Sequence, residues 1–126
     1  MATTNNKPVQ VGQIKPDVIA ALNLSIPADT PIYIGDSNIT HMKSKHPNDY
    51  AKYGQYINVI LASPDYVGIN PSDNSIEYVK EFVINNDFVK VAVRVSQSGN
   101  LYARSLYILN PNRVKNFVAN GTLKKP

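Results

Sequence analysis

Three runs in the second half of the chain are rich in residues that favour β-strands, Ile76–Ile84, Phe88–Ser96 and Leu101–Leu109, and in Phe88–Ser96 apolar and polar positions alternate cleanly. Strict alternation is typical of β-strands that bury one face. The segments between the runs, Asn85–Asp87 and Gln97–Asn100, consist of residues that favour hairpin turns. The pattern therefore predicts a three-stranded antiparallel meander.

The first half of the chain has apolar residues at helical spacing instead. Helices are predicted to begin at Pro16, at Asp36 or Ser37, and at Asn48 or Asp49, and a closing helix is predicted to begin at Asn112. Pro47 should end the second helix, because proline disfavours helical dihedrals in the residue before it. Short strands are predicted at 31–34 and 66–69. The predicted fold class is α+β, with helices first, then an antiparallel sheet, then one more helix.

Composition narrows the function classes. The chain has 126 residues, of which 43% are hydrophobic, enough for one buried core. We expect a flexible tail or linker over residues 1–13 and a single domain over residues 14–126. The sequence has no cysteine and two histidines, so neither a metal site nor another cofactor is expected. It also has no apolar run or signal peptide that would suggest a membrane partner.

One predicted strand carries a cationic face. In Phe88–Ser96 the four valines at 89, 91, 93 and 95 share one side, which should be the core side. Lys90 and Arg94 then lie together on the opposite side. The net charge of +4 agrees with an anionic partner such as RNA or a nucleotide. The alternative is that both cations simply solvate the open side of a sheet.

The hairpin turns predict which residues lie beside these cations. A turn centred on Ser98–Gly99 would pair Arg94 with Ala103, Ala92 with Ser105, and Lys90 with Tyr107. Lys90, Arg94, Ser105 and Tyr107 would then form one polar patch with Ala92 and Ala103 as its floor, suited to a phosphate.

The same reasoning places two further charged residues. A turn at Asn86–Asp87 would bring Glu81 opposite Ala92. In a regular strand Arg104 would fall on the apolar face, so either it extends to an edge or a β-bulge turns it toward the patch.

Both histidines fall on the predicted helix over residues 38–46, together with Lys43 and Lys45. Histidine is the usual general acid or base near neutral pH. His41 and His46 are five residues apart and point in different directions, so at most one should face the cations directly. Each could instead be an ordinary surface or capping residue.

Four segments resemble the phage and prophage nuclease-like domains of the barnase, EndoU, colicin and RelE-like group of ribonucleases. These segments are Pro31–Pro47, Asn74–Lys80, Val89–Arg94 and Tyr102–Tyr107. The resemblance covers roughly residues 26–125. It implies N-terminal helices packed on a curved antiparallel sheet, and metal-independent RNA cleavage in which the 2′-hydroxyl attacks the adjacent phosphate.

The resemblance also implies roles for individual residues. His46 or His41 would be the general base, and Ser105 or Tyr107 a positioning donor in the catalytic site. The phosphate-binding residues would be Lys90 and Arg94, with Arg104 beside them. A toxin-like hydrolase of this kind would act in the bacterial cytoplasm or be associated with the phage particle, with an inhibitor or a host protein as a further partner.

Two other function classes remain open. The same basic face would also suit a non-catalytic phage module that holds a nucleotide, RNA or host protein, for instance in an anti-defence role. A weaker alternative is a structural accessory of the phage particle. Loss of both histidines would abolish a nuclease and leave a binding module intact.

Overall fold

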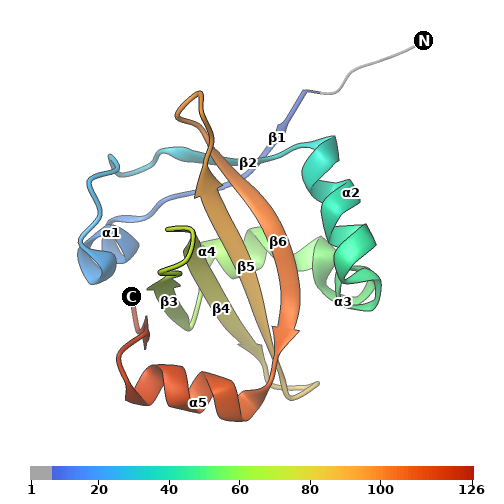
Figure 1. Cartoon of the computed structure of the whole chain (residues 1–126), viewed down its shortest axis with the longest axis vertical. Coiled ribbons are helices and arrows are strands. Elements are labelled where there is room, and N and C mark those ends of the chain that lie inside the picture. The colour runs from blue at the N-terminus through green and yellow to red at the C-terminus, as the bar shows by residue number, and fades with distance from the viewer. Residues whose placement is uncertain (1–6) are drawn as a thin grey trace.

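The computed structural model describes residues 7–126 and is built around a seven-stranded sheet with the order β1-β2-β6-β5-β4-β3-β7 (Figure 1). The strands are β1 (Val9–Gln13), β2 (Pro31–Ile34), β3 (Tyr66–Ile69), β4 (Ile76–Phe82), β5 (Asp87–Val95), β6 (Leu101–Leu109) and β7 (Leu123–Lys124). The pair β2–β6 is parallel, and the other neighbours are antiparallel. The predicted meander is the β4–β5–β6 centre of this sheet.

The helices are interleaved with the strands along the chain. They are α1 (Pro16–Leu22), α2 (Asp36–Lys45), α3 (Pro47–Tyr53), α4 (Ile57–Ala62) and α5 (Pro111–Ala119), and a 3-10 turn, η1 (Gly54–Tyr56), joins α3 to α4. The α+β class is thus confirmed. The helix predicted to begin at Asn48 or Asp49 is divided into α3, η1 and α4, because the backbone at Tyr53 and at Tyr56 departs from helical dihedrals.

The amino-terminal boundary differs from the expected tail. Residues 9–13 form β1, which pairs with β2 at the edge of the sheet, and residues 1–6 lie outside the described part of the chain. The segment has no periodic apolar pattern because an edge strand exposes much of its surface, and Val9 is 64% exposed. At the carboxyl end, Leu123 is buried, and Leu123 and Lys124 pair with β3 as β7.

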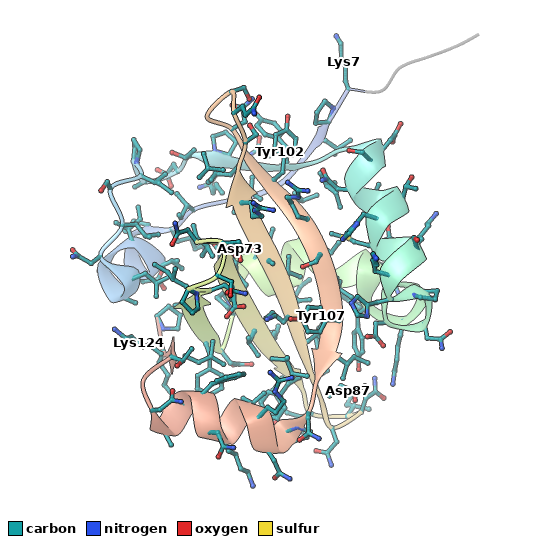
Figure 2. The ribbon with its side chains drawn as sticks, viewed as in Figure 1. Lys7, Asp73, Asp87, Tyr102, Tyr107 and Lys124 are labelled. Atoms are coloured by element: carbon teal, nitrogen blue, oxygen red, sulfur yellow. The ribbon has the colours of Figure 1, made fainter. Side chains whose placement is uncertain are left out.

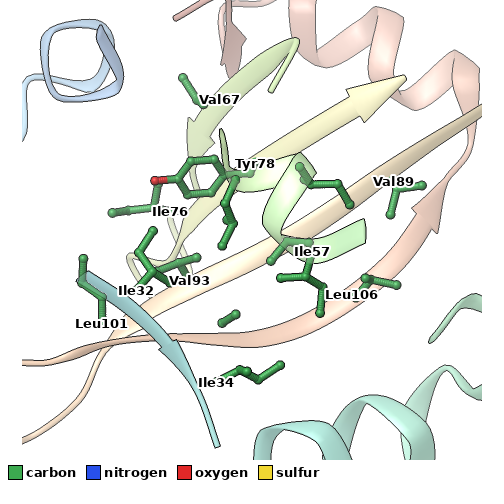
Figure 3. Close-up of a cluster of buried hydrophobic side chains, with 14 of the residues drawn as sticks. Ile32, Ile34, Ile57, Val67, Ile76, Tyr78, Val89, Val93, Leu101 and Leu106 are labelled. Carbon is green, nitrogen blue, oxygen red and sulfur yellow. The ribbon is translucent and has the colours of Figure 1, made fainter. Parts of the chain in front are cut away.

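The main core lies on one face of the sheet. Val89, Val91 and Val93 of β5 are fully buried there, against α4, as predicted (Figure 3). Val95 was also expected in the core, yet it is 57% exposed. The reason is that β4 begins at Ile76, the partner of Val93, so Val95 has no neighbouring strand on that side.

The opposite face is covered only in part. Helix α5 packs over one end of it, where Val79, Leu109, Val114 and Leu123 form a second small core. The helix begins at Pro111, because the side chain of Asn110, rather than that of Asn112, accepts the capping hydrogen bond. In Figure 1, α4 lies behind the strands and α5 lies at their lower end. We call the remaining uncovered side of β4, β5 and β6 the open face.

The β4–β5 turn brings a different acid to the open face from the one expected. Residues 83–86 form the turn, so Glu77, rather than Glu81, pairs with Ala92, and Glu81 pairs with Phe88. The two glutamates are four residues apart, and side chains alternate with a period of two, so both lie on the same face. The predicted face was therefore right and the predicted partner wrong.

A β-bulge in β6 explains the position of Arg104. Lys90 pairs with Tyr107 and Ala92 with Ser105, as predicted, but Arg94 pairs with Tyr102 rather than with Ala103. Ala103 pairs instead with Val93 and is fully buried in the main core, so it is no floor for the patch. Arg104 is the extra residue and is exposed. Of the two alternatives for Arg104, the bulge is the one that the structure contains.

Candidate active site on the open face

A buried ion pair stands at the centre of the open face. Lys90 Nζ lies 2.7 Å from Glu77 Oε2, and both side chains are about nine-tenths buried. Burial alone lowers the pKa of Lys90, but the hydrogen bond to Glu77, followed by the interaction with Tyr107, outweighs it, so the pKa lies above its ordinary value. Lys90 is therefore a fixed ammonium with further N–H donors for an anion.

An aromatic side chain connects this ammonium to an imidazole. Lys90 Nζ lies 4.7 Å from the centroid of the Tyr107 ring, within range of a cation–π interaction. The His46 ring stacks on Tyr107, with 4.9 Å between the centroids and 28° between the planes. Glu77, Lys90, Tyr107 and His46 thus form one continuous set, which we call the stack.

The backbone around His46 holds its ring in this place. His46 is the junction between α2 and α3: its N–H donates to Met42 O, and its carbonyl accepts from Tyr50 N–H. One turn into α3, Asp49 Oδ2 accepts from the N–H of Ile108 at 3.1 Å. Because Ile108 is the residue after Tyr107, this bond fixes α3 against β6 where the stack forms.

The loop between β3 and β4 closes the other side of the stack. Asn70 Nδ2 lies 3.4 Å from Glu77 Oε2. The pKa of Asp73 lies below its ordinary value, first because Ser75 donates to its carboxylate and then because of the positive charges of Arg94 and Lys90. Figure 2 shows Asp73 in this loop and Tyr107 on β6, with β5 between them.

The other two predicted phosphate ligands line a separate pocket. Arg94 and Arg104 contribute to a pocket of about 480 Å³ between the β5–β6 hairpin and the start of α2. Tyr102, which pairs with Arg94, also lines it. Among residues 7–126, neither arginine forms an ion pair, in contrast to Lys90.

The structure thus separates the sequence-predicted residues into groups. His46, Tyr107 and Lys90 meet in the stack, and Ser105 lies on the same face opposite Ala92. His41 is exposed on α2 and is outside the stack. The sequence reasoning missed Glu77 and Asp73. The signal for Glu77 was its place in β4, where an acidic residue alternates with the buried Ile76 and Tyr78.

Two further properties concern metals and membranes. In the part of the chain that the structure describes, no three His, Asp or Glu side chains gather in a group that could hold a metal ion. None of the helices within residues 7–126 is both long and apolar enough to cross a membrane.

Comparison with known proteins gives one match. The model of the family described as phage-Barnase-EndoU-ColicinE5/D-RelE like nuclease 3 matches residues 9–116. This range begins with β1 and ends inside α5, so it contains every residue of the stack and both pocket arginines. No curated protein and no solved structure matches the chain.

Proposed function

The chain belongs to this phage nuclease-like family, and from that membership we propose that it is an endoribonuclease that works without a metal ion. One observation carries the proposal: His46 stacks on Tyr107, and the buried Lys90 ammonium contacts the same ring. A proton acceptor, a hydroxyl donor and a fixed cation are the groups that transesterification of RNA requires.

The proposed reaction assigns one role to each group. His46 takes the proton from a 2′-hydroxyl, whose oxygen attacks the adjacent phosphorus and forms a new O–P bond. The negative charge on the phosphorane oxygens is stabilised by the Lys90 ammonium. The bond from phosphorus to the 5′-oxygen then breaks, and the Tyr107 hydroxyl gives that oxygen a proton. The products are a 2′,3′-cyclic phosphate and a 5′-hydroxyl end.

A second candidate function is a non-catalytic module that binds RNA or a nucleotide. The ion pair favours it, because Glu77 already compensates the charge of Lys90 and gives the pair a structural role. Such a module would bind RNA without cutting it, and His46 would contribute only packing.

Cleavage in EDTA distinguishes the two functions. Purified protein is incubated with total RNA and with a defined single-stranded oligoribonucleotide, and the ends of the products are identified. We expect 2′,3′-cyclic phosphate ends, and a loss of rate of about 10²- to 10⁴-fold for His46→Ala. Tyr107→Phe keeps the ring and the stack but removes the hydroxyl, so it tests the proton donor separately.

The controls use residues outside the stack. Lys115→Ala removes an exposed cation of α5 and should leave the rate unchanged. His41→Ala should have a much smaller effect than His46→Ala, because His41 is outside the stack. If wild-type protein binds RNA but leaves it intact under all conditions, the binding module is the better account.

A further inference from the structure

The pocket at the hairpin end of the open face has no part in the proposed chemistry. It lies between the start of α2 and the ends of β5 and β6, and its walls include Gly35–Asn38, Ser96 and Tyr102. Its two cations, Arg94 and Arg104, come from adjacent strands, and Asp36 is the one acidic residue in its lining. The pocket is therefore electropositive.

The bulge in β6 is what brings Arg104 to this pocket. Without the extra residue, Arg104 would continue the register of Tyr107 and Ser105, pair with Val93 and point into the main core. A bulge changes the direction of a side chain at the expense of regular pairing, and bulges are frequent beside active sites. Arginine suits the position because its planar guanidinium can donate two parallel hydrogen bonds to a phosphate.

Tyr102 adds an aromatic surface to the cations. Its ring is half-buried and lies 6.1 Å from that of Tyr33 at an angle of 45°. A tilted partner supports the ring from one direction, and the lining of the pocket includes Tyr102. Unpaired bases stack on such rings with little dependence on sequence.

We propose that this pocket is a subsite for a nucleotide that flanks the cleaved linkage, with its phosphate on Arg94 and Arg104 and its base on Tyr102. The inference rests on the proposed function, because it takes the stack as the cleavage site. The substrate class is single-stranded RNA, because a paired base could not stack on Tyr102.

The separation of Lys90 and Arg94 along β5 determines the shortest RNA strand that can contact both cations. Lys90 and Arg94 are four residues apart on one strand, so their Cα atoms are about 13 Å apart at a strand rise of about 3.3 Å per residue. A single nucleotide held at the stack does not reach both cations. The enzyme should therefore use longer strands more efficiently than dinucleotides.

Binding of an uncleavable strand tests the subsite apart from catalysis. The probe is a short fluorescent 2′-O-methyl oligoribonucleotide, which has no free 2′-hydroxyl, and its affinity is measured by anisotropy over a series of salt concentrations. We expect Arg94→Ala and Arg104→Ala each to reduce the slope of log K against log salt by about 0.7, the value for one single-strand phosphate contact. Tyr102→Ala should weaken binding by about tenfold, and Tyr102→Phe should not.

The matched control is Arg113→Ala, which removes an exposed arginine of α5, at the opposite end of the sheet from the β5–β6 hairpin (Figure 1), and should leave the slope unchanged. Unchanged slopes for Arg94→Ala and Arg104→Ala overturn the subsite. An equal loss of cleavage rate on a dinucleotide and on a longer strand also overturns it, because it places the arginines at the cleaved phosphate. Reduced slopes in a protein that cuts no RNA support this pocket as a binding site for single-stranded RNA and refute only the proposed nuclease function.

Discussion

Removal of one partner of the buried ion pair between Lys90 and Glu77 should strongly lower the free energy of unfolding. Lys90→Met leaves the Glu77 carboxylate about nine-tenths buried without a cation. Breaking a buried pair in this way typically costs about 3–5 kcal/mol, because the remaining charge is desolvated and uncompensated. Since domains of this kind have about 5–15 kcal/mol of stability in total, we expect a variant that has lost a large fraction of its stability.

Removal of both partners should restore most of the stability. In Glu77→Leu/Lys90→Met, apolar side chains of similar volume replace the pair, and such replacements are often neutral or stabilising. Thermal unfolding followed by circular dichroism measures both variants. We expect Tm to fall by roughly 10–20 °C for Lys90→Met, and by much less for the double variant.

The double variant also separates stability from chemistry. It should be folded, and on the proposed mechanism it should cleave RNA about 10²- to 10³-fold more slowly, because the cation proposed to stabilise the phosphorane is absent. Equal values of Tm for Lys90→Met and wild type would refute the reasoning on burial. A folded double variant with full activity would refute the role of Lys90 in the reaction.

Three further predictions concern residues that hold the site and the sheet together. Asp49→Ala removes the acceptor that fixes α3 to β6, so kcat should fall more than KM rises. Asp49→Asn keeps an acceptor oxygen and should retain more activity. Equal kcat values for the two variants would contradict this positioning role. The pKa of Asp87 lies below its ordinary value of 3.8, first because the Tyr53 hydroxyl donates to its carboxylate at 2.6 Å. The ionised form therefore stabilises the fold above about pH 4, this contribution is lost as the pH falls through the lowered pKa, and Asp87→Asn should flatten the acidic part of a plot of unfolding free energy against pH. A Cβ on Gly68 would lie 2.5 Å from the carbonyl oxygen of Thr122, so Gly68→Ala should cost about 1–3 kcal/mol by separating β3 from β7, and an unchanged urea midpoint would contradict the contact.

The sequence by itself determined the features that depend on neighbouring residues. The alternation of β5 identified the face of Lys90 and Arg94, because adjacent side chains of any strand point to opposite sides. Pro47 marked the junction of α2 and α3, because its ring restricts the preceding residue directly. The Ser98–Gly99 turn also gave the correct partner of Lys90, Tyr107.

The tertiary structure decided the features that depend on residues far apart in the sequence. Glu77 replaced Glu81 as the acid opposite Ala92, because the exact register of two strands follows from the length of their turn and the packing of the whole face. The bulge at Arg104 avoids burying a guanidinium in the main core, a cost that exists only once that core has formed. The contact between His46 and Tyr107 joins two elements about sixty residues apart, and no local pattern specifies it. Local sequence patterns thus indicated candidate side chains such as His46 and Lys90, and long-range packing determined which of them lie together.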